Sequence, residues 1–302
     1  MIFSLVAFAA TLAASGPPHE LHIVDRVSKF ETFYQDATRT PISAGARFAL
    51  WQKEDGIAAV PPGPQGQQMA RELLDAAWPR YPSLVAKLPV MAETAQADAQ
   101  ASFTALNRLF ADEETPIDTR LVLYVGQFDN NAYTIPAMNG NPPTVMMSVE
   151  NANLRVELAH ELAHSINFQL AHVKNSFGAP IGETMFLEGL AMHASKDIVP
   201  GMPDRRYTEM PGDTGWLAQC EARKGRILAG IRPYLNASGR DSAMRFTFGT
   251  GTTGMHREAY CAGWILVGSL LESGYDFPKL ARIPETEMVP TIAAALDRFE
   301  RK

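Results

Sequence analysis

The sequence predicts an α+β fold in which helices dominate. Stretches rich in alanine, leucine, glutamine and glutamate cover much of residues 20–114, and amphipathic stretches follow residue 153. Between these two parts lie three short runs of β-forming residues, at 119–125, 133–135 and 144–149. A small sheet is therefore expected just before the central helices. With 46% apolar residues, the composition is that of an ordinary globular protein.

The chain begins with an apolar segment. Residues 1–15 carry no charged side chain and end in the small residues Ala13, Ala14 and Ser15, as a cleaved secretory signal peptide does. The segment is shorter than the roughly 20 residues that span a bilayer, and no later stretch is long enough either. We expect an exported protein, periplasmic or secreted, without a membrane span once the signal is removed.

Two regions are expected after the signal peptide. Residues 16–114 form a helical N-terminal region, with helices at 67–78 and 90–110 and prolines at their breaks. Residues 115–302 form the second region, in which the small sheet precedes further helices. These helices are expected at 153–172, 181–197, 214–235, 257–273 and 289–301.

The charge balance excludes one class of partner. The chain has 27 Lys and Arg against 33 Asp and Glu, a net charge of −6, and no basic run. Nucleic-acid binding, which needs a basic surface, is not expected.

The segment His160-Glu161-Leu162-Ala163-His164 matches the H-E-x-x-H pattern. Residues four apart lie nearly above one another on a helix, so both imidazoles can bind one Zn²⁺ ion. Glu161 lies one step around the helix, where its carboxylate can take a proton from a water molecule without binding the metal. The pattern predicts a zinc site with His160 and His164 as ligands and Glu161 as general base.

A third ligand must come from elsewhere, and two glutamates are candidates. Eighteen residues separate His164 from Glu183, whereas Glu188 lies beside the small residues Gly189 and Ala191. Small residues allow two helices to approach closely, which favours Glu188. Because the two glutamates are five residues apart, about 140° around a helix, they cannot both face one metal ion.

The HELAH segment, followed after 22 residues by Leu187-Glu188-Gly189-Leu190-Ala191, resembles the predicted zinc-dependent proteases of the YjaZ-like family. The likeness covers roughly 119–271 and includes the later segment 260–264. It implies a zincin-like fold and peptidase chemistry for the region 115–302, with His160, His164 and Glu188 as ligands and Glu161 as base. Ala163 stands where the family often has a second histidine.

Zinc-dependent hydrolysis also needs a donor for the developing oxyanion. The resemblance makes Tyr260 the first candidate, with His256 and Arg257 as alternatives. His193, five residues after Glu188, is expected to be structural. The run 144–149 comes directly before the helix that carries the H-E-x-x-H segment. From this order we expect it to be the edge strand that binds an extended peptide.

Two further features leave alternatives open. The glycine-rich segment 249–254 matches G-x-G-x-x-G after a strand-like run at 245–248, but no second strand follows. A flexible loop near the cleft is expected there, not a dinucleotide site. Cys220 and Cys261 could form a disulfide in an oxidising compartment or remain buried thiols.

The function expected from these observations is an exported zinc-dependent peptidase acting on a peptide or protein substrate. Two other functions remain open. The chain could be a catalytically inactive periplasmic protein that keeps a zinc-stabilised zincin fold for binding or as a scaffold, or a zinc amidase acting on a non-peptide or cell-wall amide.

Overall fold

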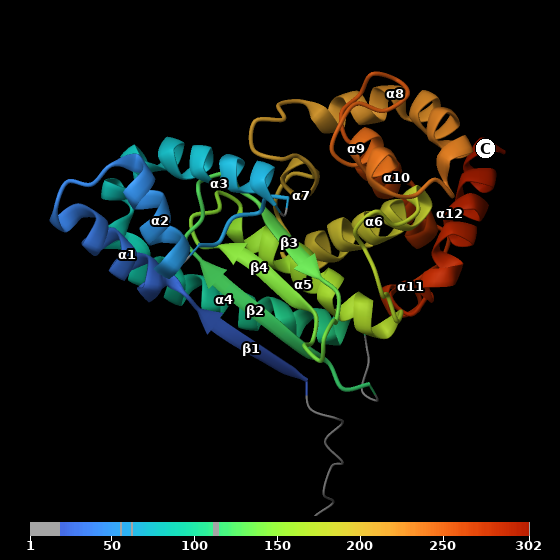
Figure 1. Ribbon diagram of the computed structural model, residues 1–302. Coiled ribbons are helices and arrows are strands. Elements are labelled where there is room, and N and C mark those ends of the chain that lie inside the picture. Colours follow the sequence, from blue (N-terminus) through green and yellow to red (C-terminus); the bar gives the residue numbers. More distant parts are fainter. Residues whose placement is uncertain (1–18, 55, 62, 111–114, 302) are drawn as a thin grey trace, which may run out of the picture.

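The computed structural model describes residues 19–54, 56–61, 63–110 and 115–301 (Figure 1). The predicted signal peptide, residues 1–15, lies outside the described residues. Within the described residues, no helix combines the length and the apolarity that crossing a membrane requires.

In the described part of the chain, one sheet of four strands forms the centre of the structure, in the order β1-β2-β4-β3. The strands are β1 (Glu20–Asp25), β2 (Asp118–Tyr124), β3 (Ala132–Ile135) and β4 (Thr144–Ser148). β1, β2 and β4 are parallel, whereas β3 pairs with β4 in the antiparallel direction. β3 therefore forms an edge of the sheet, and β4 lies in its interior. The prediction that 144–149 is the edge strand is wrong, because β4 inserts between β2 and β3.

Among the residues that the structure describes between β1 and β2, there are four α-helices and two short 3₁₀ segments. They are α1 (Val27–Arg39), α2 (Ala44–Glu54), α3 (Pro64–Ala77), η1 (Trp78–Ser83), η2 (Val85–Lys87) and α4 (Leu88–Phe110). Because β1 pairs with β2, the sheet receives strands from both sides of residue 114. The division into an N-terminal region (16–114) and a second region (115–302) stays a prediction.

The remaining helices follow β4. They are α5 (Leu154–Leu170), α6 (Ile181–Ile198), α7 (Arg205–Thr208), α8 (Trp216–Ile231), η3 (Arg232–Tyr234), α9 (Arg240–Phe246), α10 (Glu258–Glu272), α11 (Phe277–Ala281) and α12 (Glu285–Glu300). Figure 1 shows α4 and α5 side by side behind the sheet. α6 packs against α5 on one side and against α10 and α12 on the other.

The predicted fold class is confirmed, since a small sheet precedes the H-E-x-x-H helix in a mainly helical chain. The three predicted strands and the principal predicted helices are present. β1 was missed although Leu21 and Ile23 alternate with the exposed Glu20 and His22, because this short run lies within the predicted helical N-terminal region. The strand-like run 245–248 is not a strand, since residues 240–246 form α9.

Two glycines bring α6 and α10 into backbone contact. A Cβ atom on Gly189 would lie 2.4 Å from the carbonyl oxygen of Gly263. A Cβ atom on Gly263 would in turn lie 2.3 Å from the carbonyl oxygen of Met185. Both distances are shorter than any real Cβ contact, so these positions admit no side chain unless the helices move apart.

The first turn of α6 buries a carboxyl group. Glu183 is 4% exposed, and its Oε1 atom has no hydrogen-bond partner among the described residues. Burial, together with the nearby negative charge of Glu285 at the start of α12, raises the pKa of Glu183 to about 7. A buried carboxyl group without a partner costs free energy when it is ionised.

The raised pKa of Glu183 predicts how stability varies with pH. Because the folded protein holds this proton more tightly than the unfolded chain, the free energy of unfolding should fall as pH rises from about 4.5 to about 7, and stay reduced above that range. Glu183→Gln does not titrate, so between pH 4.5 and 8 it should gain about 2–3 kcal/mol relative to the wild type. Urea denaturation at each pH measures the difference. If the free energies of unfolding of the two proteins change in parallel with pH, the pKa of Glu183 is not raised.

Candidate metal centre

α5 places two histidines one above the other on its inner face. His160 and His164 are four residues apart, and their rings meet edge to face with centroids 4.7 Å apart. The opposite side of α5 carries Leu158 and Leu162, which are fully buried in the core. The helix is therefore held on one side by apolar packing and presents both imidazoles on the other.

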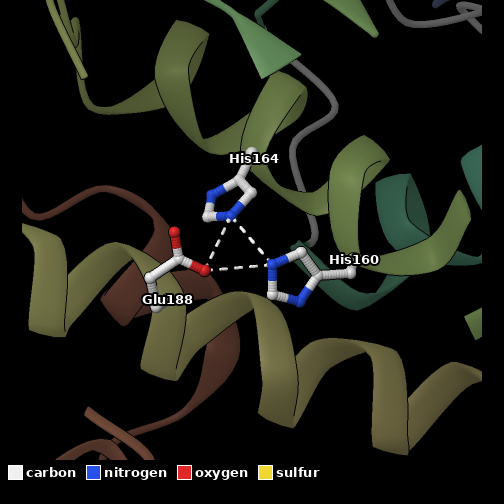
Figure 2. A group of neighbouring side chains, drawn as sticks. All are labelled: His160, His164 and Glu188. Carbon is white, nitrogen blue, oxygen red and sulfur yellow. Dashed lines mark hydrogen bonds and ion pairs between the residues drawn. The ribbon is translucent and has the colours of Figure 1, made fainter. Parts of the chain in front are cut away.

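α6 supplies a carboxylate to the same point. Glu188 Oε2 lies 3.1 Å from His160 Nε2 and 3.4 Å from His164 Nε2, and the two Nε2 atoms are 3.1 Å apart (Figure 2). The three side chains are 13%, 8% and 16% exposed. Among the described residues, they are the group of His, Cys, Asp and Glu side chains close enough together to hold a metal ion.

The three ligand atoms fit a zinc ion. Ligands at about 2.0–2.1 Å from tetrahedral Zn²⁺ lie roughly 3.3 Å from one another. The observed separations of 3.1, 3.1 and 3.4 Å match this triangle. Two histidines and one glutamate are also a known ligand set of catalytic zinc sites, in which the fourth position stays open.

The electrostatics of the cluster couple its members strongly. Burial disfavours a charged imidazole, but the hydrogen bond and the charge of Glu188 outweigh it and raise the pKa of His160 to about 9. Burial likewise disfavours the Glu188 carboxylate, yet the two imidazoles hold its pKa well below the usual range. The site therefore favours a carboxylate beside a positive charge.

The predicted general base lies next to the cluster in the chain. Glu161 is 6% exposed and its carboxylate accepts a hydrogen bond from the Thr134 hydroxyl on β3, with 2.7 Å between Thr134 Oγ1 and Glu161 Oε2. This contact was not predicted from the sequence. Nothing in the sequence marks Thr134, because the pairing joins a strand and a helix that are distant along the chain.

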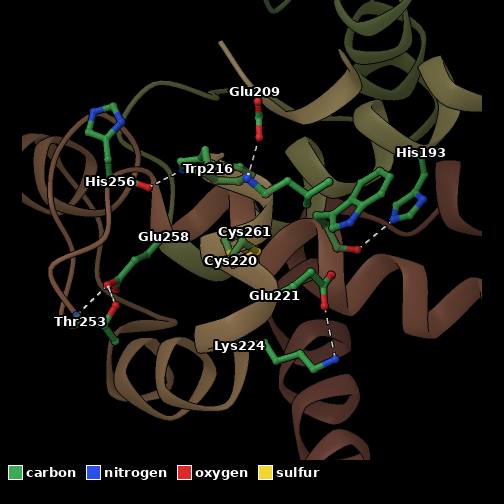
Figure 3. The surroundings of a disulfide bond; sticks show 12 residues. His193, Glu209, Trp216, Cys220, Glu221, Lys224, Thr253, His256, Glu258 and Cys261 are labelled. Carbon is green, nitrogen blue, oxygen red and sulfur yellow. Dashed lines mark hydrogen bonds and ion pairs between the residues drawn. A yellow bond between two sulfur atoms is a disulfide. The ribbon is translucent and has the colours of Figure 1, made fainter. Parts of the chain in front are cut away.

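Glu183, the other candidate ligand, is not brought into the cluster. It lies at the first turn of α6, where its charged neighbour is Glu285. His193 is also turned away from the cluster. Its ring stacks on Trp264 with centroids 4.1 Å apart, and its Nε2 atom lies 2.9 Å from the Trp264 carbonyl oxygen (Figure 3).

Tyr260 lies near the cluster on the first turn of α10. Burial and then the negative charge of Glu188 raise the pKa of its phenol well above the usual value. The guanidinium carbon of Arg257 is 3.9 Å from the centroid of the Tyr260 ring. Arg257 itself has left-handed backbone geometry, with φ of 58°, and an ion-pair distance of 3.6 Å to Asp213.

His256 is held elsewhere. Its Nε2 atom lies 2.7 Å from the Phe248 carbonyl oxygen, and its own carbonyl oxygen accepts a hydrogen bond from Trp216 Nε1. Of the three oxyanion candidates, Tyr260 and Arg257 therefore lie together. The His256 side chain points to the neighbouring loop (Figure 3).

A disulfide ties α10 to α8. Cys220 of α8 and Cys261 of α10 are bonded, with Cα atoms 5.7 Å apart, so the bond joins the residue after Tyr260 to a second helix (Figure 3). Both cysteines are fully buried. Of the two alternatives open from the sequence, the structure has the disulfide.

The glycine-rich segment 249–254 holds a carboxylate of the chain itself. Glu258 is fully buried and accepts hydrogen bonds from the backbone N–H and the hydroxyl of both Thr252 and Thr253, at 2.6–3.1 Å. A Cβ atom on Gly251 would lie 2.1 Å from the Glu258 carboxylate. The donors that a phosphate would need are therefore occupied, and the loop is anchored to α10.

Comparison with known proteins identifies the family to which the chain belongs. Residues 137–288, half of the chain, match the family model described as predicted Zn-dependent protease (DUF2268). This segment contains His160, His164, Glu188 and Tyr260. No curated protein and no solved structure was found to match the chain. The chain thus belongs to the predicted Zn-dependent protease family DUF2268, in agreement with the resemblance of its HELAH and LEGLA segments.

Proposed function

We propose that the protein is an exported zinc-dependent peptidase with a zincin-like fold. The observation that carries the proposal is the triangle of His160, His164 and Glu188 ligand atoms, with the negative charge of Glu161 near enough to act on His160. The family description supports the same chemistry.

The proposed ligands are His160, His164 and Glu188. A zinc ion held by them would act as a Lewis acid that acidifies a water molecule and polarises the scissile carbonyl. Glu161 takes the proton of the attacking water and passes it to the leaving amine. The Tyr260 hydroxyl donates a hydrogen bond to the developing oxyanion, and Arg257 over its ring places a positive charge nearby.

The edge strand β3 is the proposed binding place for the substrate backbone. It pairs with β4 through one edge, lies against α5, and can offer its other edge to an extended peptide. The proposed substrate strand is therefore 132–135 and not 144–149, which lies in the interior of the sheet.

Export rests on two features of the chain. The apolar segment 1–15 has the composition of a signal peptide. The buried disulfide between Cys220 and Cys261 suits an oxidising compartment such as the periplasm or the cell exterior.

Metal content tests the ligand assignment. Purified wild-type protein should retain about one zinc ion per chain, and Glu188→Ala should bind zinc at least about 10–100-fold more weakly, because one of three protein ligands is lost. Glu183→Ala is the matched control, a glutamate on the same helix, and should retain zinc. Elemental analysis after dialysis measures both. Loss of zinc in Glu183→Ala with retention in Glu188→Ala would exclude the proposed site.

The role of Glu161 is tested by a neutral isostere. Glu161→Gln should retain zinc, but its rate of peptide cleavage should fall roughly 10²–10⁴-fold, because proton transfer is lost. A peptide library with mass-spectrometric detection measures cleavage, and peptidoglycan fragments are assayed in parallel to detect an amidase. If wild type and variant are both inert on every substrate while zinc still raises the melting temperature, the protein is a zinc-binding scaffold.

Tyr260→Phe removes one hydroxyl and keeps the ring under Arg257. We expect kcat to fall roughly 10²–10³-fold, as when an oxyanion donor is removed, with little change in KM. His256→Ala is the control and should keep kcat, because its side chain contacts the neighbouring loop. Steady-state kinetics on the best library peptide measures both variants, and unchanged kcat in Tyr260→Phe would assign the oxyanion to another donor.

A further inference from the structure

The Glu161 carboxylate is held by a strand residue outside the metal cluster. Thr134 Oγ1 lies 2.7 Å from Glu161 Oε2 and 2.9 Å from the carbonyl oxygen of the same residue. Within the part of the chain that the structure describes, no second side chain donates a hydrogen bond to this carboxylate. The orientation of Glu161 therefore depends on one hydroxyl.

The chemistry of the contact favours the carboxylate over the carbonyl. A threonine hydroxyl has a single hydrogen, so it donates to one acceptor at a time. A hydrogen bond to an ionised oxygen is shorter and stronger than one to a neutral oxygen, in agreement with the two distances. Oε2 is therefore engaged, and Oε1 is left to accept a proton.

The hydroxyl is fixed by the sheet. Thr134 pairs with Val145 of β4 in the antiparallel register, and Val145 is fully buried. β4 in turn lies between β3 and β2. The position of Thr134 Oγ1 is thus set by the strand pairing, and the sheet is linked to the inner face of α5 through this side chain.

We propose that Thr134 is a positioning residue, which holds Glu161 in one orientation with Oε2 bound and Oε1 directed to the attacking water. The inference rests on the proposed function, since Glu161 must be the general base. It assigns a role to the edge strand besides substrate binding. The same four-residue strand would align the peptide and orient the base. The positions of the substrate peptide and of Glu161 would then both depend on β3.

Two substitutions at Thr134 test the proposal. Thr134→Val keeps the β-branched shape without the hydroxyl, and kcat should fall roughly 10–100-fold with KM nearly unchanged, as for a displaced catalytic group. Thr134→Ser restores the hydroxyl and should recover most of kcat. Zinc content should be unchanged in both variants. If valine prevents folding, Thr134→Ala takes its place.

A threonine of the same sheet supplies the matched control. The Thr144 hydroxyl donates to the Pro142 carbonyl oxygen at 3.1 Å and contacts no group of the cluster. Thr144→Val should keep wild-type kcat and KM. Equal loss in Thr134→Val and Thr144→Val, failure of serine to restore kcat, or a rise in KM alone would overturn the proposal, since each indicates only a structural role.

A structural readout separates this inference from the proposed function. Crystal structures of wild type and Thr134→Val should show Glu161 in one orientation in the former and rotated or in several orientations in the latter. An identical orientation in both would overturn the positioning role even if the enzyme is active. If no substrate is cleaved by the wild type, the peptidase proposal fails, while the orientation experiment still decides what Thr134 does to Glu161.

Discussion

A metal ion bound by His160, His164 and Glu188 would require their three candidate ligand atoms to lie about 3 Å from one another, and the packing of α5 against α6 meets this requirement. One turn of α5 satisfies it for His160 and His164 without help from the rest of the chain. Glu188 can satisfy it only if α6 crosses α5 at a fixed distance. Burying the Glu188 carboxylate costs free energy unless a positive charge or a metal ion lies beside it. Glu188 is therefore stable in this position only together with the two histidines or a metal ion.

The second half of the chain holds α6 in that position. α10 and α12 cover the side of α6 that faces away from α5, and the disulfide ties α10 to α8. The loop before α10 is fastened by Glu258, whose carboxylate binds two threonines. Tyr260 follows two residues later. The order of the elements thus places the oxyanion candidate on a helix whose first turn is held at Glu258 and at Cys261.

Features that depend on local periodicity could be predicted from the sequence, and features that depend on distant pairing could not. The histidine pair follows from the pitch of a single helix. Glu188 was favoured because Gly189 would allow a close approach to the histidine helix, but in the structure Gly189 contacts α10 instead. The order of β3 and β4 was wrong, since four or five residues do not encode which strand lies at the edge. The Thr134–Glu161 contact joins residues 27 apart in the chain and leaves no pattern at either position. Likewise, the glycine-rich segment gave no sign that Glu258 would fill it.

The glycine contact between α6 and α10 has a consequence for how such a site can diverge. Because Gly189 and Gly263 let main-chain atoms touch, the separation of the two helices is set by the polypeptide backbone, which every sequence shares. Other side chains on both helices can be substituted without moving Tyr260 relative to Glu188. Neither glycine can be replaced alone without widening the gap, so the spacing of Tyr260 and Glu188 depends on the backbone contact between α6 and α10.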